Sequence, residues 1–166
     1  MSTSSDIVVI GGGIAGISAA ARLSGDASVT VLEMEKTIGH HSTSRSAAIF
    51  IRNYGNATIR ALNAASYEFL ANPSDVSETP LVSPRGKLMI AAESEMPKLL
   101  DYINGSEGLE QITPSQAAEI VPILRPETFS SAIYESGTKD IDVDRMLQGF
   151  ARILRQNDGQ IATDAA

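Results

Sequence analysis

The sequence predicts an α/β fold that begins with a βαβ unit, and three observations support this prediction. An unbroken apolar run over residues 7–10 is typical of a strand buried in a parallel sheet, and we expect this strand over residues 6–10. It leads directly into the pattern Gly-x-Gly-x-x-Gly, which is formed by Gly11, Gly13 and Gly16. A second run, Val29-Thr30-Val31-Leu32, lies in an expected strand over residues 28–33 and ends in Glu33, close to the spacing expected of a dinucleotide-binding unit.

Each part of this motif has a physical role. Gly11 permits a tight turn, Gly13 lets a pyrophosphate approach the backbone, and Gly16 lets the following helix pack closely on the sheet. That helix points its free N–H groups and its positive dipole end at the phosphates. Glu33 is placed to accept hydrogen bonds from a ribose diol. The alternative is a strand–helix turn that binds nothing, which the full strand–turn–helix–strand context disfavours.

Apolar spacing and turn signals predict further elements along the chain. Helices are expected over residues 14–24, 56–71, 95–102, 113–121 and 142–156. Strands are expected over residues 87–92, 129–135 and 159–162, with a hydroxyl-rich loop over residues 37–48. Thr113 is expected as an N-cap, with Pro114 at the first helical position. This order predicts a Rossmann-like domain into which a second, antiparallel domain is inserted.

Composition narrows the function classes. The chain has 166 residues and a net charge of −7, with 43% hydrophobic and 20% charged residues, as in ordinary globular proteins. The negative balance argues against nucleic-acid binding and against a polybasic membrane patch. The absence of cysteine excludes disulfides, thiolate metal sites and a flavin attached through cysteine.

The uncharged stretch over residues 7–21 predicts neither a signal peptide nor a membrane span. No Lys or Arg precedes it, and three consecutive glycines interrupt it. It is also too short and too rich in glycine for a transmembrane helix. The cysteine-free composition fits a reducing compartment, so we expect a cytoplasmic protein.

Several different short motifs are distributed along nearly the whole chain. They are His41-Ser42-Thr43, Arg45-Ser46-Ala47-Ala48, Tyr54-Gly55, Arg60-Ala61-Leu62, Ala64-Ala65-Ser66, Ser83-Pro84-Arg85, Ile120-Val121-Pro122 and Asp140-Ile141-Asp142. Together with the glycine motif and Glu33, they resemble FAD-dependent oxidoreductases of the D-amino acid oxidase type. Within that family they are most similar to the bacterial D-arginine dehydrogenase branch.

The resemblance implies a Rossmann-like FAD-binding domain with an inserted antiparallel substrate domain. Gly11, Gly13 and Gly16 would hold the FAD pyrophosphate, and Glu33 the adenosine ribose. The segment under the flavin side would contribute Ser42, Thr43, Ser46, Ala47 and Ala48. Ile14, Ala15 and Met34 complete the expected cofactor-binding set. The implied reaction, part of amino acid catabolism, is hydride transfer from the Cα of an amine or D-amino acid to flavin N5.

The resemblance also assigns residues near the substrate, and here the chain departs from the branch. Tyr54 matches a tyrosine near flavin and substrate, which would make it a catalytic residue; a packing tyrosine is the alternative. Lys87 stands where the branch has an acidic residue that receives a cationic side chain, so it would repel arginine and attract a carboxylate. Ile49 replaces a titratable histidine. These departures argue against a preference for D-arginine.

The relatives that the chain resembles are about twice as long. The expected division is residues 1–75 for the FAD-binding βαβ part and the following helix, 76–139 for part of the substrate domain, and 140–166 for the return to the FAD-binding domain. The part that corresponds to the C-terminal half of these relatives is expected to be absent from this sequence. We therefore expect an N-terminal part, with a partner chain as one source of the missing half.

Other interpretations remain open. The chain could belong to a relative that oxidises a 2-hydroxy acid or glycerol 3-phosphate, or be a non-catalytic flavin-binding fragment or subunit. An NAD(P) enzyme is a weaker alternative because the loop over residues 42–46 is rich in hydroxyls. His40 and His41 are either a base or flavin contact, or solvated side chains. Adjacent histidines without nearby acids make a poor metal site, so no metal is expected.

Overall fold

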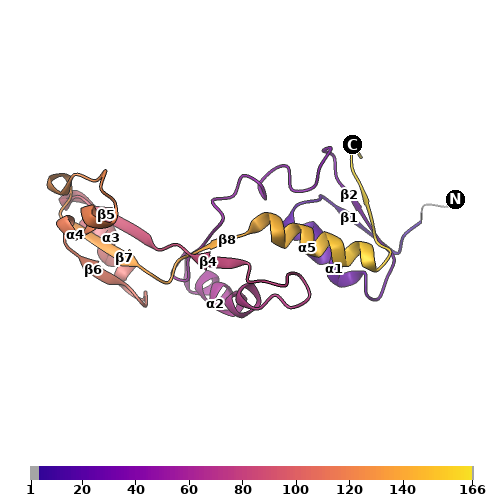
Figure 1. Cartoon of the computed structure of the whole chain (residues 1–166), viewed down its shortest axis with the longest axis horizontal. Coiled ribbons are helices and arrows are strands. Elements are labelled where there is room, and N and C mark those ends of the chain that lie inside the picture. Colours follow the sequence, from indigo (N-terminus) through magenta and orange to yellow (C-terminus); the bar gives the residue numbers. More distant parts are fainter. Residues whose placement is uncertain (1–3, 166) are drawn as a thin grey trace. The chain divides into compact units, whose positions relative to one another are not determined.

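The computed structural model describes residues 4–165, and Figure 1 shows their helices and strands. The chain divides into two compact units. Unit 1 comprises Met1–Ala48, Glu68–Val82 and Ile141–Ala166, within the described range. Unit 2 comprises Ile49–Tyr67 and Ser83–Asp140.

Unit 1 is built on a parallel three-stranded sheet. Its strands are β1 (Ile7–Ile10), β2 (Val29–Leu32) and β9 (Gln160–Ala162), in the order β1-β2-β9. Ile7 pairs with Val29, and Val31 pairs with Ile161. Parallel strands need a crossover connection, and α1 (Ile14–Leu23) supplies it between β1 and β2. The predicted βαβ unit is therefore present, and the carboxyl ends of its strands meet at one edge.

Two helices cover one face of this sheet. Helix α1 packs against α5 (Val143–Gln156) and against β2 (Figure 1). Buried side chains of this layer include Ile17, Ala20, Val29, Val31, Ala151 and Leu154. By contrast, Val8 and Ile10 are 53% and 79% exposed. Within residues 4–165, β1 pairs with a strand on one side only, so this apolar strand has an open edge.

Unit 2 contains an antiparallel sheet, as expected for the inserted part. It is formed by β5 (Lys87–Ala91), β7 (Ser131–Glu135) and β6 (Glu110–Ile112), in the order β5-β7-β6. A second short sheet consists of β3 (Ile49–Phe50), β8 (Lys139–Ile141) and β4 (Val82–Pro84), in the order β3-β8-β4. In this sheet Phe50 pairs antiparallel with Lys139.

The helices of unit 2 pack on its antiparallel sheet. They are η1 (Glu93–Glu95), α3 (Met96–Ile103), α4 (Pro114–Ile120) and η2 (Pro126–Thr128). The buried side chains are Ala91, Leu99, Ile112, Ala117, Phe129, Ala132 and Ile133. Helix α2 (Ala57–Ala71) contributes residues to both units. Within the described residues, no helix has both the length and the apolar character that crossing a bilayer requires.

Local capping signals in the sequence are confirmed. Thr113 and Gln116 form a reciprocal capping box at the start of α4, and Pro114 is its first residue. The Asp142 carboxylate accepts a hydrogen bond of 2.9 Å from the Arg145 N–H at the start of α5. These side chains satisfy backbone N–H groups that the helices leave without partners.

The structure also differs from the expectations. Strands β3, β4, β6 and β8 were not predicted, because two or three residues are too few to show an alternating pattern. The two compact units have other boundaries than the expected ranges 1–75, 76–139 and 140–166, since residues 49–67 lie in unit 2 and residues 76–82 in unit 1. The chain therefore enters unit 2 earlier than the expected ranges place it. The functional division of the chain stays a prediction.

Gly149 tests the packing of α5. A Cβ at this position would overlap the Val76 carbonyl oxygen and a Val76 methyl group. We expect Gly149→Ala to lower the free energy of unfolding by about 1–3 kcal/mol, measured by urea unfolding with circular dichroism. Gly25→Ala is the matched control, because its Cβ would lie 3.9 Å from its nearest neighbour, the Arg22 carbonyl oxygen. Equal stability of the two variants would contradict this packing.

Candidate functional site

The glycine turn between β1 and α1 has the geometry that its sequence predicts. Gly11 has φ +101°, a conformation that favours glycine, and its N–H donates to the Leu32 carbonyl at 2.8 Å. A Cβ on Gly16 would overlap the Gly11 carbonyl oxygen. Helix α1 can therefore begin directly against the turn only because residue 16 has no side chain.

The first turn of α1 presents backbone donors. The Ile14 N–H donates to Thr43 Oγ1 at 3.0 Å. The N–H groups of Ala15 and Gly16 have no acceptor among the residues that the structure describes. Free N–H groups at a helix N-terminus, together with the helix dipole, favour an anion such as a phosphate.

The Glu33 carboxylate lies at the carboxyl end of β2 and is 6% exposed. Its Oε1 accepts from the Glu35 N–H at 2.9 Å, and its Oε2 accepts from the Gly12 N–H at 2.6 Å. These two backbone hydrogen bonds, that from Glu35 first, lower the pKa of Glu33 below its usual range. Each carboxylate oxygen keeps a second lone pair that could accept from a hydroxyl group.

The loop after Glu33 folds back over the glycine turn. The Gly39 N–H donates to the Gly12 carbonyl at 2.9 Å, and Gly39 has φ +75°. This fold-back brings Thr43 beside Gly13, where a Cβ would lie 3.2 Å from Thr43 Oγ1. Further along, the Ala48 N–H donates to Ser46 Oγ at 3.1 Å. Loop and glycine turn together make one wall of a cleft.

That cleft has a volume of about 350 Å³ and brings together six of the twelve residues predicted to bind a cofactor. They are Gly11, Gly13, Glu33, Met34, Ser42 and Thr43. Ile14, Ala15 and Gly16 form the first turn of α1. Ser46 and Ala48 line a neighbouring cavity of about 230 Å³, which Thr43 also lines, and Ala47 is exposed between them. Eight of the twelve predicted residues thus line two adjoining cavities of unit 1.

A family profile described as DAO, FAD-dependent oxidoreductase, matches residues 6–166. The chain belongs to this family. FAD, the cofactor that the sequence predicted, is therefore the cofactor of its family.

Solved structures agree in fold with this member of the DAO family. L-α-glycerophosphate oxidase from Mycoplasma pneumoniae, with FAD bound, matches with TM-score 0.81 at 18% identity, over 96% of this chain and 44% of that one. L-proline dehydrogenase from P. horikoshii matches with TM-score 0.75 at 24% identity, over 99% of this chain and 45% of that one. Glycine oxidase from Geobacillus kaustophilus matches with TM-score 0.79 at 18% identity, over 96% of this chain and 46% of that one. The chain spans less than half the length of these proteins.

The cleft of unit 1 fits the diphosphate and ribose of the DAO-family cofactor. The glycine turn leaves space at the backbone, two N–H groups are free, and the Glu33 carboxylate retains acceptor capacity. What the sequence did not indicate is that Glu33 also braces the turn through Gly12. The one sequence feature related to this bond is Gly12, the middle glycine of the run, since a Cβ on Gly12 would lie 2.9 Å from Glu33 Oε2.

The two histidines line the same cleft. His41 Nε2 lies 2.9 Å from Glu35 Oε1, and the ring of His40 contacts that of His41 edge-on at 5.1 Å between centroids. Glu35 is the partner that the sequence did not reveal. Among residues 4–165, no group of three or more His, Cys, Asp or Glu side chains is arranged to hold a metal ion.

The two residues predicted near the substrate lie in unit 2. Tyr54 follows β3 and is 64% exposed. Lys87 lies on β5, where its Nζ is 2.7 Å from the Tyr102 hydroxyl and 3.3 Å from Glu135 Oε2. Burial, and then the hydrogen bond to Glu135, raise the pKa of Tyr102. The catalytic role of Tyr54 and the substrate-pocket role of Lys87 stay predictions.

The lowered pKa of Glu33 predicts a pH dependence of stability. Because the folded state holds the carboxylate ionised, the unfolded state binds more protons as the pH falls below the ordinary glutamate value of 4.5. This contribution to stability is present above that pH and is lost as the pH falls through the folded pKa. We expect Glu33→Gln to lose less stability than wild type between neutral and acidic pH, measured by urea unfolding at several pH values. Parallel pH profiles for the two proteins would contradict this assignment.

Proposed function

We propose that the chain forms the FAD-binding part of an oxidoreductase that oxidises an amine or a D-amino acid at Cα. The observation that carries this proposal is the cleft of unit 1, where a glycine turn, free helix N–H groups and a buried carboxylate converge. Unlike a turn that binds nothing, this arrangement leaves donors and acceptors available for a dinucleotide. Membership of the DAO family supports FAD as that dinucleotide.

In this proposal, different parts of the cofactor are bound by different predicted residues of unit 1. The backbone of Gly11, Gly13 and the first turn of α1 binds the pyrophosphate, and Glu33 binds the adenosine ribose. The flavin side is held by Ser42, Thr43, Ser46, Ala47 and Ala48. When bound, FAD supplies the hydride acceptor for the reaction. The protein contributes binding, orientation and electrostatics.

The substrate class is inferred from the names of two similar proteins and from the motif resemblance. Glycine oxidase and L-proline dehydrogenase are named for amino acid substrates, which favours oxidation at a carbon–nitrogen bond. The D-configuration rests on the motif resemblance alone. The positive charge that Lys87 was predicted to bring to the substrate pocket is balanced by the Glu135 carboxylate, with which it forms an ion pair. Selection against cationic substrates at this point is correspondingly weak.

A second candidate is oxidation of glycerol 3-phosphate or a 2-hydroxy acid. It is favoured by the likeness to L-α-glycerophosphate oxidase, which has a TM-score of 0.81. Because the chain spans less than half of that protein, we propose that the rest of the active site comes from polypeptide outside this sequence, either in the same chain or in a partner. A non-catalytic flavin-binding subunit is the third candidate. The cysteine-free composition is our reason for proposing a cytoplasmic location.

Binding of FAD is the first test. We expect the purified chain to comigrate with a flavin absorbance spectrum on gel filtration after FAD is added. Glu33→Ala should weaken FAD binding by about tenfold or more, since it removes charge-assisted hydrogen bonds. The matched control is Glu119→Ala, an exposed position on α4. Unchanged affinity of Glu33→Ala would refute the ribose assignment, and a colourless wild type would refute autonomous FAD binding.

Substrate class is tested by anaerobic loss of flavin absorbance in the FAD-loaded chain, combined with the polypeptide that supplies the rest of the active site. We expect bleaching by an amine or by D-amino acids, compared with L-amino acids at equal concentration. Bleaching by L-amino acids alone would contradict the D-configuration. Bleaching by glycerol 3-phosphate alone would favour the second candidate. No bleaching by any of them, in the completed protein with FAD bound, would favour the non-catalytic subunit.

A further inference from the structure

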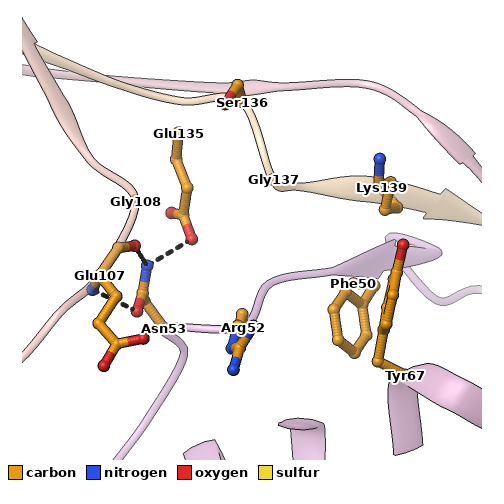
Figure 2. A pocket seen from close by; sticks show the side chains of 10 residues that line it. All are labelled: Phe50, Arg52, Asn53, Tyr67, Glu107, Gly108, Glu135, Ser136, Gly137 and Lys139. Carbon is orange, nitrogen blue, oxygen red and sulfur yellow. Dashed lines mark hydrogen bonds between the residues drawn. The ribbon is translucent and has the colours of Figure 1, made fainter.

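Unit 2 contains a cavity of about 400 Å³ that the proposed function does not use (Figure 2). Its volume falls in the range typical of small-molecule sites. The lining residues all belong to unit 2 and come from β3, α2, β7, β8 and three loops: Phe50, Arg52, Asn53, Tyr67, Glu107, Gly108, Glu135, Ser136, Gly137 and Lys139. None of them is a predicted cofactor residue.

One wall of the cavity is a fixed polar network. Asn53 Nδ2 donates to Glu135 Oε1 at 2.8 Å and to the Glu107 carbonyl at 2.9 Å, while Asn53 Oδ1 accepts from the Glu107 N–H at 3.1 Å. Asn53 is 4% exposed and Glu135 3%. On the far side, Tyr102 and Lys87 donate to Glu135 Oε2. The negative charge of Glu135 is therefore already balanced within the protein.

The opposite wall is aromatic. Figure 2 shows Phe50, Tyr67 and Lys139 on one side of the cavity and Glu135, Asn53 and Glu107 on the other. The Phe50 and Tyr67 rings lie 5.6 Å apart between centroids. Phe50 pairs directly with Lys139 across β3 and β8, so their side chains extend from the same face of that sheet. A planar apolar group could pack on this wall with a cation beside it.

The cavity has more free positive than free negative charge. Within the described part of the chain, neither Arg52 nor Lys139 forms an ion pair, whereas neighbouring Arg85 pairs with Asp140. Glu107 is the one acidic lining residue whose charge no described cation balances. Two unpaired cations against one unpaired carboxylate favour an anionic ligand.

We propose that this cavity binds a small carboxylic acid that has a planar apolar substituent. The carboxylate pairs with Lys139 and Arg52, and the substituent packs on Phe50 and Tyr67. Asn53 and Glu135 form the rigid polar wall and do not contact the ligand's charged group, because their hydrogen-bonding partners lie within the protein. This site shares no lining residue with the unit 1 cleft, and its binding does not depend on FAD.

The probe is phenylacetate, added to the full 166-residue chain and followed by isothermal titration calorimetry and amide NMR shifts. We expect saturable binding, with shifts concentrated at the lining residues of unit 2. Lys139→Gln and Arg52→Gln should each weaken binding by about three- to tenfold, as expected for a lost charge pair. Lys98→Gln is the matched control, because Lys98 is exposed on α3 and does not line the cavity. Circular dichroism establishes that each variant is folded.

The outcomes separate this proposal from its alternatives. Benzylamine, which has the opposite charge on a similar ring, should not displace phenylacetate. Tighter binding of benzylamine would overturn the proposal and assign the site to cations through Glu107. Equal weakening in Lys98→Gln and Lys139→Gln would show non-specific attraction and also overturn it. Displacement of phenylacetate by FAD would move the binding to unit 1, whereas failure of FAD binding alone leaves this test unaffected.

Discussion

The hydrogen bond between the Glu33 carboxylate and the Gly12 N–H connects the parts of the candidate cofactor site. Through it, the end of β2 holds the turn that follows β1, while the Gly39 N–H holds the other side of the same residue through its carbonyl. Both backbone groups of Gly12 are thus used. The turn is fixed without the donors of the first helical turn at Ala15 and Gly16, which remain available to a ligand.

The sheet of unit 1 depends on few strands. It has helices on one face, and Val8 and Ile10 remain exposed on β1, so the hydrophobic stabilisation of this unit is smaller than that of a doubly covered sheet. A ligand that binds only the folded state adds stability by mass action. Folding of unit 1 and occupation of its cleft are therefore coupled. The same coupling would apply to any polypeptide that covers β1.

The sequence predicted the parts of this fold that depend on local patterns. The glycine turn, the long amphipathic helix α5 and the cap at Thr113 each require only residues close in the chain. Structure that depends on contacts between distant segments could not be predicted in this way. The strands of two or three residues exist because distant segments pair, as Phe50 does with Lys139, and no periodicity marks them. For the same reason the brace between Glu33 and Gly12 and the inclusion of residues 49–67 in unit 2 were not foreseen.

Lys87 shows why a charge cannot be assigned to a substrate from its position in the sequence. It lies 48 residues from Glu135, yet the two form an ion pair in which the Glu135 side chain is 4% exposed. A carboxylate buried to that degree needs a partner, and removing the partner leaves an uncompensated charge. Loss of activity in a Lys87 variant would therefore report first on the integrity of unit 2. The cations that are free to meet a ligand there, Arg52 and Lys139, belong to no recognisable motif, and only the fold brings them to one cavity.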